Sequence, residues 1–225
     1  MINIDTIYQR VLTLANKEQR GYITPQEFNL LANQAQLDIF EQYFYDINQF
    51  SKIDDYGSEY SDSKDSLDGK IAIFQLTVPL VSGNLPDNLY RLGTVVHNNS
   101  EAERVEQKEL LYINISKLAK PTVNRPLYTR TGNVIQIYNG SGTPVSTGIR
   151  CNYIRKPHEV EWGYNVVVGK ALYQPNTSVD FELHSSEETK LVIKILELAG
   201  IVINKPGLIS VASQKEASKI QQEKA

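Results

Sequence analysis

The spacing of apolar residues changes twice along this chain of 225 residues, and this change most limits the folds that the chain can adopt. Residues 1–50 and 186–199 carry apolar residues at the three- and four-residue steps of helices. Residues 71–185 carry short runs rich in β-branched and aromatic residues, separated by Gly, Pro and Asn. The order predicts an α+β fold, in which N- and C-terminal helices form a bundle and an antiparallel β-sandwich-like domain is inserted between them.

Two helices are expected at the N-terminal end. The first covers residues 4–15, with Asn3 as its N-cap. The second begins at Thr24-Pro25-Gln26-Glu27, where Thr is the cap, Pro takes the first helical position and Glu completes a capping box. If it continues to Ile47, it is about 35 Å long at about 1.5 Å per residue. Its apolar face is too broad for contact with one helix, so several neighbours are expected around it.

A further amphipathic helix is expected near the C-terminal end. Ser185 and Glu188 have the spacing of a capping box, and an apolar stripe follows over residues 191–199. After Gly200 comes a polar tail over residues 200–225, which either contacts a partner or is disordered. Its few apolar residues are the candidate interface residues, on an arm that begins near Pro206: Leu208, Val211, Ala212 and Ile220.

Residues 51–70 differ from both flanks because acidic residues alternate with Ser, Gly and Tyr. This composition predicts a solvated acidic loop or linker between the helical part and the β-rich domain over residues 71–185. The loop does not fit an EF-hand. With Gly69 at the sixth position of a calcium loop, Lys64 and Gln75 fall where carboxylates are needed. An irregular cation site in this loop stays an alternative.

The β-rich domain contains one clear hairpin. Its strands are expected at 127–131 and 134–138, joined by Gly132-Asn133, a pair suited to the positive φ angles of two-residue turns. A short helix is expected near 109–118, ahead of Pro121. Further extended segments are expected at 71–78, 85–96, 148–155, 170–174 and 178–183.

Residues that commonly carry catalysis are scattered along the chain. His97, His158 and His184 are far apart and lack the spacing of zinc ligands. The single cysteine, Cys151, lies in a strand run, where a small buried hydrophobe is usual. No Gly-rich phosphate loop precedes a helix. We therefore expect no enzyme activity, no catalytic residues, no metal and no cofactor, although sequence alone leaves a pair of catalytic carboxylates open.

Charge and hydropathy limit the partners. The net charge of −3 gives no overall basic field to attract nucleic acid. The β-rich domain has a mild basic bias that could form a nucleic-acid face, although the polar side of any sheet looks the same. The residues concerned are Arg125, Arg130, Arg150, Arg155 and Lys156, with Tyr128, Tyr138 and Tyr153. No apolar run approaches a membrane span, and no signal peptide is recognisable, so no membrane association is expected.

Several phrases together resemble proteins of the head-to-tail region of tailed bacteriophages. Leu85-Pro-Asp-Asn-Leu-Tyr-Arg-Leu92 resembles their "L-P-x-D-x-x-R-L" phrase, and residues 124–138 resemble their "N-x-P-x-Y-x-x-x-G-x-x-I-x-I-Y" hairpin. Tyr153-Ile-Arg-Lys-Pro157 matches the "Y-I-R-x-P" that comes next. Residues 7–28 and 181–224 are also similar to these proteins, so the resemblance spans nearly the whole chain. It is strongest to the ring or adaptor proteins of crAss-like and other short-tailed phages, the class that includes tail tubular protein A.

The resemblance implies a structural virion protein with a helical bundle joined to a β-sandwich-like part. Several copies, typically twelve in such connectors, would form a homo-oligomeric ring between portal and tail. Packaged DNA would pass through the ring without sequence-specific binding. The implied partners are the portal protein and neighbouring tail ring proteins, and the implied location is the neck or tail of the virion, after assembly in the cytoplasm of the bacterial host. The acidic segment 51–70 has no counterpart in this pattern.

Two other classes of function stay open. One is a β-sandwich module with helical flanks that binds carbohydrate or nucleic acid, and the other is a hydrolase. The tail from Pro206 separates the connector from these alternatives, because in a connector it would dock along the portal or an adjacent ring subunit.

Overall fold

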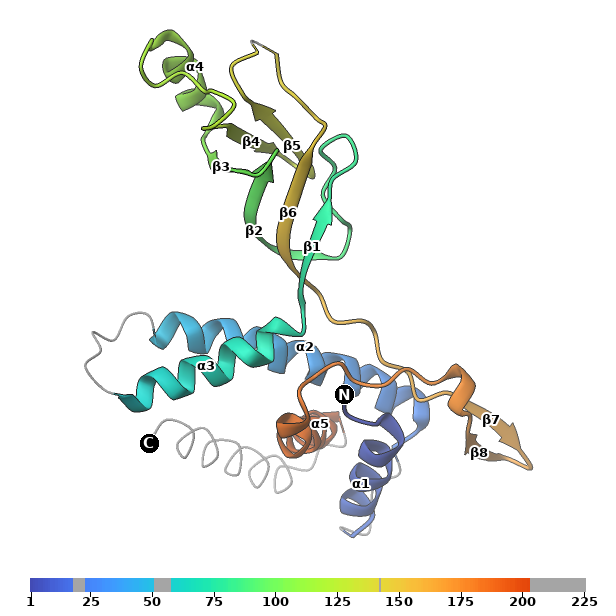
Figure 1. Cartoon of the computed structure of the whole chain (residues 1–225). Helices are drawn as coiled ribbons and strands as arrows, with labels where there is room; N and C mark the ends of the chain where they lie inside the picture. The colour runs from blue at the N-terminus through green and yellow to red at the C-terminus, as the bar shows by residue number, and fades with distance from the viewer. Residues whose placement is uncertain (18–22, 51–57, 142, 203–225) are drawn as a thin grey trace. The chain divides into compact units, whose positions relative to one another are not determined.

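The computed structural model describes residues 1–17, 23–50, 58–141 and 143–202. It is a mixed α+β structure that divides into two compact units (Figure 1). Unit 1 combines Met1–Ile73 with the chain from Pro157 onward, and unit 2 is Phe74–Lys156. The α+β class predicted from the sequence is confirmed, with described helices both before and after a β-rich insertion.

Among its described residues, unit 1 contains four α-helices: α1 (Ile4–Lys17), α2 (Pro25–Phe50), α3 (Ser58–Ala72) and α5 (Glu188–Val202). Helix α5 packs against both α1 and α2, and α3 packs against α2. The apolar faces recognised in the sequence supply the core, because Ile7, Phe28 and Ile195 each have no exposed surface. The broad apolar face of α2 is therefore covered by several neighbours, as expected.

The N-terminal helix caps form as the sequence predicts. The Asn3 side-chain oxygen accepts the Thr6 backbone N–H at 3.0 Å at the start of α1. At the start of α2, the Glu27 carboxylate accepts the Thr24 backbone N–H at 2.9 Å, and the Thr24 hydroxyl accepts the Glu27 backbone N–H at 3.3 Å. These bonds satisfy donors that the first helical turn leaves without partners.

The Thr24–Glu27 box should make helix stability depend on pH. Its hydrogen bonds lower the pKa of Glu27 below the ordinary 4.5, so the stabilisation is present above pH 4.5 and is lost as the pH falls through the lower folded-state pKa. We expect Glu27→Gln to lower the thermal midpoint of the helical circular-dichroism signal at pH 7. The difference from the wild type should shrink below pH 4.5. A difference that stays constant between pH 7 and pH 3 would contradict this account.

The start of α5 differs from the prediction. The chain passes through a short 3₁₀ turn, Ser185–Glu187, and the cap is the His184 side chain, which accepts the Ser186 backbone N–H at 3.2 Å. Glu188 instead forms an ion pair with Arg10 of α1 at 2.6 Å. The predicted Ser185–Glu188 box does not form, because the Glu188 backbone N–H bonds to the Ser185 carbonyl within the 3₁₀ turn and the Glu188 carboxylate is paired with Arg10.

The acidic segment 51–70 is not a loop over its whole length. Residues 58–70 belong to α3, which continues to Ala72. Leu67 and Ile71 are buried, one helical turn apart, while the acidic Asp65 and Asp68 are exposed. This narrow apolar stripe, with many acids and serines around it, was too weak to indicate a helix from composition. The boundary between the units therefore lies at Ile73–Phe74 instead of within the acidic segment.

Unit 2 is one curled sheet in place of the predicted sandwich-like pair of sheets. Its strands are β1 (Gln75–Pro79), β2 (Leu89–His97), β3 (Ser100–Arg104), β4 (Leu127–Thr131), β5 (Val134–Tyr138) and β6 (Ile149–Arg155). They lie in the order β1-β6-β2-β3-β4-β5, and every pair is antiparallel except β3 with β4. The predicted hairpin at 127–138 is confirmed as β4 and β5. Helix α4 (Gln107–Ile115) lies where the short helix was expected.

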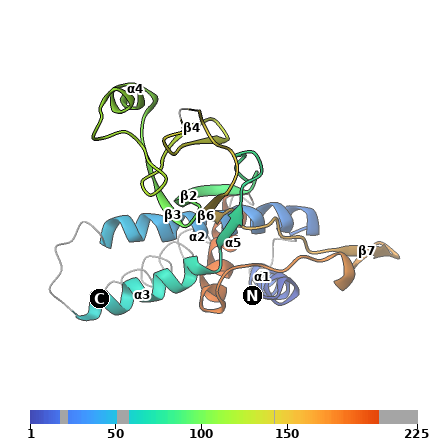
Figure 2. The same ribbon diagram turned by 45° about the horizontal axis from the view of Figure 1, so that its top comes forward.

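The two ends of this sheet approach each other. The segment after β1 pairs with β5, because the Ile135 N–H donates to the Gly83 carbonyl at 2.8 Å and the Leu85 N–H donates to the Asn133 carbonyl at 2.9 Å. Gly83 has a φ of +76°, and a Cβ there would clash with the Ile135 carbonyl. The strands thus curve around one core (Figure 2). That core contains Leu80, Leu85, Val95, Ala102, Tyr128, Ile135, Ile137, Ile149, Cys151 and Tyr153.

Cys151 should report on the integrity of unit 2. Its side chain has no exposed surface, and burial raises the pKa of the thiol, so little thiolate is available to react. We expect the native chain to react with a thiol reagent such as DTNB at least about tenfold more slowly than the unfolded chain. Because this is the only cysteine of the chain, the signal belongs to unit 2 alone. Rapid labelling of the native chain, at the rate of the unfolded chain, would contradict the placement of Cys151 in the core.

Residues 157–185, which were expected to belong to the β-rich domain, are part of unit 1. Their only regular strands are β7 (Tyr164–Val167) and β8 (Lys170–Tyr173), which form a separate two-stranded sheet. Apart from the 3₁₀ turn Pro175–Thr177 and the start of the turn at Ser185, the rest of this segment is extended chain that packs on the helices of unit 1, with Phe181 and Leu183 fully buried. Its assignment to the β-rich domain failed because extended backbone can bond to helix side chains as well as to strands.

Candidate interaction surfaces

The candidate interface residues Leu208, Val211, Ala212 and Ile220 lie outside the described residues, as does the arm from Pro206. The three histidines occupy unrelated places. His97 is buried in unit 2, His158 lies beside Glu182 in unit 1, and His184 caps the turn before α5. Within the described ranges, no group of three or more His, Cys, Asp or Glu side chains could hold a metal ion.

Three amide side chains on α2 hold the extended chain at 158–162. Asn29 bonds to both backbone groups of Trp162, and Asn33 bonds to both backbone groups of Val160. In each pair the backbone N–H donates to the asparagine side-chain oxygen at 2.8 Å. The Asn29 side-chain NH₂ donates to the Trp162 carbonyl at 3.4 Å, and the Asn33 NH₂ donates to the Val160 carbonyl at 2.9 Å. Gln36 continues the row by donating to the His158 carbonyl at 2.8 Å.

The spacing of this amide row matches that of a strand. Asn29 and Asn33 are four helical residues apart, about 6 Å, which is close to the advance of about 6.6 Å over two strand residues. Gln36 follows after only three residues, about 4.5 Å, and its longer side chain still reaches the His158 carbonyl. The Gln36 oxygen also accepts the Glu182 backbone N–H at 3.2 Å, so the row fixes a second extended segment. Helix α2 thus replaces the partner strand that these backbone groups would otherwise need.

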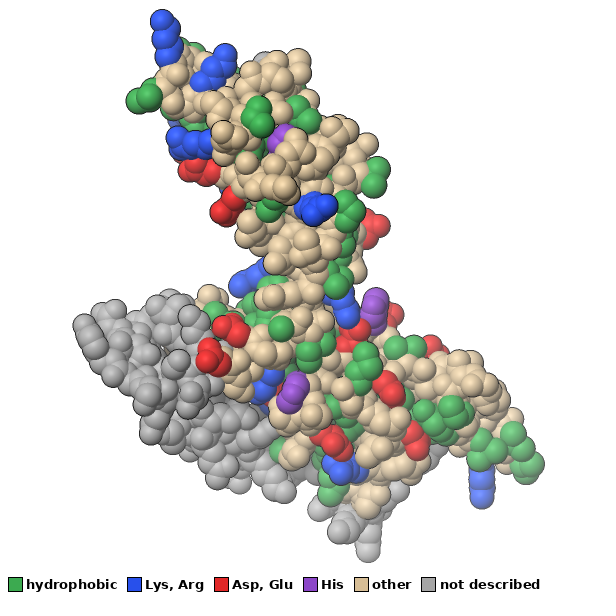
Figure 3. Space-filling view, in the orientation of Figure 1, with side chains coloured by type: hydrophobic (Ala, Val, Ile, Leu, Met, Phe, Trp, Pro, Cys, Tyr) green, Lys and Arg blue, Asp and Glu red, His purple; other side chains and the backbone are tan. Residues whose placement is uncertain are grey.

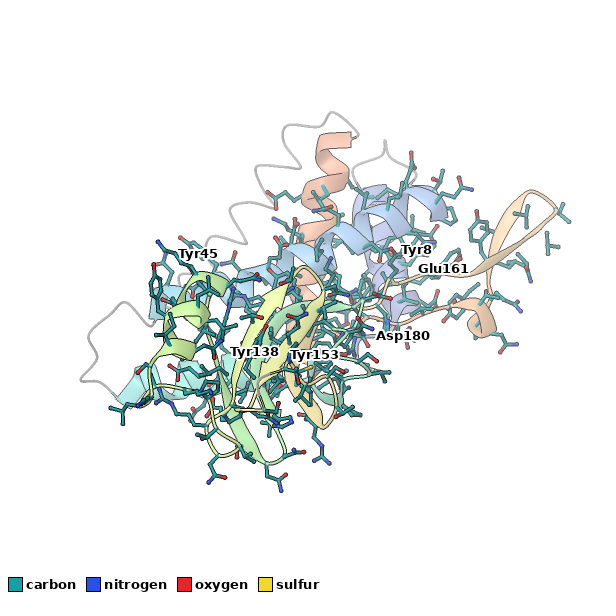
Figure 4. All side chains as sticks on the ribbon, turned by 90° about the horizontal axis from the view of Figure 1, so that it is seen from above. Tyr8, Tyr45, Tyr138, Tyr153, Glu161 and Asp180 are labelled. Carbon is teal, nitrogen blue, oxygen red and sulfur yellow. The ribbon has the colours of Figure 1, made fainter. Side chains whose placement is uncertain are left out.

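Trp162 ends the row and anchors the β7–β8 hairpin. It is 2% exposed, and its indole N–H donates to the Asp5 carboxylate of α1 at 2.9 Å. Its ring lies 5.8 Å from that of Tyr164 and 5.7 Å from that of Tyr173, which are the paired residues at the base of the hairpin. The Tyr8 ring packs on it at 4.2 Å. Figure 4 labels Tyr8 and Glu161 beside the start of the hairpin. Asp180 lies at the start of α1, where its carboxylate accepts the Ile4 backbone N–H at 2.8 Å.

Beyond this base, the hairpin exposes apolar side chains on both of its faces. Val166 is 67% exposed and Val168 at the tip is 97% exposed. Val167 and Leu172, which lie on the opposite face from Val166, are 50% and 53% exposed. A two-stranded hairpin has two open edges and is marginally stable in water, so exposed apolar residues on it indicate a contact surface. Hydrophobic side chains gather at the end of the hairpin in Figure 3.

The turn of this hairpin is strained. Val168 has a φ of +50° and Gly169 a φ of +73°, which fits a turn with positive φ at both central residues. Asn and Gly suit these positions, whereas a β-branched residue such as Val is unfavourable there. An apolar valine therefore occupies the tip although a valine backbone disfavours the positive φ that this position requires. Such positions are enriched at functional sites.

Unit 2 carries a second exposed apolar surface around α4. Leu110 faces the local core with Val105 and Leu127, and Ile113 packs against this core, while several other apolar residues of the region are exposed. We define the α4 surface by Leu111, Tyr112, Ile115, Leu118 and Val123, which are 59–95% exposed, and by the exposed cations Lys108, Lys117 and Lys120. Blue cationic side chains lie at the α4 end of unit 2 in Figure 3.

The two units differ in charge. Unit 2 contains ten Lys and Arg against five Asp and Glu, a formal charge of +5. Unit 1 contains 13 Lys and Arg against 21 Asp and Glu, a formal charge of −8, and together they give the −3 of the whole chain. The net charge of the whole chain is small because the opposite charges of the two units partly cancel. A difference in charge of this kind between two parts of a protein can orient it when it associates with a partner.

One hollow of about 460 Å³ lies in unit 2, where β1 and β6 meet the turn at Asn98 and Asn99. Arg150 is its single charged residue, and Leu80 and Ile149 form its apolar part. The set offers neither a nucleophile nor a base, so the arrangement has no evident chemistry.

A comparison with protein-family models finds no match, and a comparison with curated proteins finds none either. Within the part of the chain that the structure describes, no helix is both long and apolar enough to span a membrane.

Proposed function

We propose that this chain is a structural virion protein of a tailed bacteriophage, and that copies of it form a ring in the connector between portal and tail. The observation that carries the proposal is the β7–β8 hairpin, because Trp162 and the amide row of α2 hold it firmly while its apolar tip faces solvent. A second exposed apolar surface around α4 gives the chain two places for protein contacts. The sequence phrases that resemble connector proteins support the same function.

In this proposal the chain forms a homo-oligomeric ring, with twelve copies as the expected number. Its neighbours are the portal protein and tail ring proteins, and packaged DNA passes through the ring without sequence-specific contacts. The N- and C-terminal helices act as the bundle of such a protein, and the arm with Leu208, Val211, Ala212 and Ile220 docks on a neighbouring virion protein. The protein is not an enzyme, and it assembles in the bacterial cytoplasm into the neck or tail of the virion.

The test is binding of the purified full-length chain to portal rings encoded by the same genome. We expect rings of the chain stacked on the portal in negative-stain images, and co-sedimentation of the two proteins. Removing residues 206–225 should leave a folded protein that no longer joins the portal. Failure of the full-length chain to bind the portal, together with specific glycan or nucleic-acid binding, would overturn the proposal.

The charge of unit 2 favours a second candidate function, nucleic-acid binding. A formal charge of +5 on 83 residues could attract the phosphate backbone. Fluorescence anisotropy with duplex and single-stranded DNA distinguishes the two functions. A nucleic-acid module should bind with micromolar or better affinity and lose that affinity steeply as salt rises, whereas a connector should bind the portal and show only weak, non-specific DNA binding.

A further inference from the structure

We propose that the β7–β8 hairpin of one copy of this chain docks on the α4 surface of the next copy. The proposal rests on the ring proposed above and names the two surfaces that would join its subunits. It starts from two exposed apolar surfaces, found among the residues that the structure describes, that differ in shape and charge. One is a narrow, two-sided hairpin tip, and the other is the outward side of a short helix and the chain that follows it.

The charges around the two surfaces are complementary. Glu159, Glu161 and Asp180 are exposed on the two extended segments that flank the hairpin, and Lys170 is exposed beside its tip, which gives this side a net charge of −2. Figure 4 labels two of these acids, Glu161 and Asp180. The α4 surface carries Lys108, Lys117 and Lys120 beside its apolar residues, and the exposed Glu106 and Glu109 at the start of α4 reduce its net charge to +1. Apolar residues would meet apolar residues at the centre of the contact, between two sides of opposite net charge. This arrangement is typical of specific protein interfaces.

Charge also argues against contacts between like surfaces. Two hairpins docked on each other would bring together two sides of net charge −2, and two α4 surfaces would bring together two sides of net charge +1. Like charges facing each other oppose association. The favourable contact therefore joins different surfaces on successive copies. A contact of this head-to-tail kind continues from copy to copy and gives a ring when the rotation closes.

The strained turn supports a role for the hairpin tip itself. Asparagine would suit the positive φ of residue 168 better than the valine that is present. Val168 is 97% exposed, so its side chain stabilises little within its own chain. Seating in an apolar partner surface gives this side chain a favourable environment. The exposed Ile115 and Leu118 of the α4 surface, at 81% and 95%, supply such a surface.

The experiment uses sedimentation velocity on the full-length chain and two sets of variants. The hairpin variant is Val168→Asn with Leu172→Gln, and the α4 variant is Ile115→Gln with Leu118→Gln. All four side chains are at least half exposed, so both variants should fold. Matched controls replace exposed apolar residues away from both surfaces: Leu30→Gln, 75% exposed in unit 1, and Val81→Gln, 78% exposed in unit 2.

We expect the wild type and both controls to associate beyond the dimer as concentration rises, and each variant to associate at least about tenfold more weakly. A mixture of the hairpin variant with the α4 variant should form a one-to-one pair and nothing larger, because only one intact contact is left between them. A chain carrying all four changes should stay monomeric.

Three results would overturn this inference. The first is a wild-type chain that is monomeric up to about 0.1 mM, where an association with micromolar Kd would be nearly complete. The second is a wild type that stops at a dimer, and the third is a variant that associates as the wild type does. If the wild type still forms rings on the portal in any of these cases, the proposed function stands and only the contact is wrong. If it binds neither itself nor the portal, both proposals fall.

Discussion

Replacing Trp162 by alanine should lower the free energy of unfolding of unit 1 by about 3–5 kcal/mol, the usual cost of removing a large buried aromatic side chain. The indole is 2% exposed and packs against the rings of Tyr8, Tyr164 and Tyr173. Its removal also leaves the Asp5 carboxylate without the N–H that donates to it at 2.9 Å. The measurement is denaturant unfolding followed by the helical circular-dichroism signal.

Trp162→Phe is the matched variant for this prediction. It keeps most of the ring packing but removes the indole donor to Asp5, so its loss should be smaller than that of the alanine variant. Because Trp162 is the only tryptophan, the fluorescence of the wild type reports directly on the base of the hairpin. A loss below about 1 kcal/mol for the alanine variant would show that the hairpin is not anchored through this ring.

Replacing Glu187 by glutamine should destabilise unit 1 by a similar amount, about 3–5 kcal/mol, because it leaves a largely buried cation without its counter-ion. The Glu187 carboxylate, with its side chain 2% exposed, pairs at 2.6 Å with the ammonium of Lys70, whose side chain is 15% exposed. The ammonium also lies 5.9 Å from the centre of the Tyr43 ring. The pair joins α3 to the turn before α5, so its loss should loosen α3 first. Hydrogen exchange of the α3 amides together with denaturant unfolding measures both effects.

The neighbouring Glu188 provides the control. It pairs with Arg10 at the same distance of 2.6 Å, but the two side chains are 32% and 53% exposed. Solvent screens such a pair, so Glu188→Gln should cost only about 0–1 kcal/mol. The double variant Lys70→Met with Glu187→Leu should recover much of the lost stability, since removal of both charges leaves neither of them unpaired. Equal losses in the two single glutamine variants would contradict the role assigned to burial.

The features that local sequence could predict are those decided by neighbouring residues. The cap at Thr24, the apolar stripe after Leu191 and the β4–β5 hairpin each depend on residues within about one turn or one strand, and all three are present. The exposed hairpin at β7–β8 was foreseen only as a possible strand. Its Val-Val-Val-Gly run lacks the usual turn residues, so the strained turn carried no recognisable signal.

The features that were missed depend on distant partners. No role was predicted for Asn29, Asn33 and Gln36, whose backbone partners lie more than 120 residues away in the sequence. The available sign was their spacing, which places three amides on one face of the helix. Helix α3 was missed because only Leu67 and Ile71 of its described residues are deeply buried. The candidate tail residues stay a prediction, because they lie outside the described residues.

The pairing of β1 with β6 has a consequence for how this chain could be re-engineered. These are the first and last strands of unit 2, and the Arg155 N–H donates to the Phe74 carbonyl at 3.0 Å, so the two crossing points between the units are adjacent. Residues 74–156 therefore form a cassette with neighbouring ends. Unit 1 should still fold when a turn of two to four residues replaces this cassette. The cassette itself should fold when it is inserted into a surface turn of another protein.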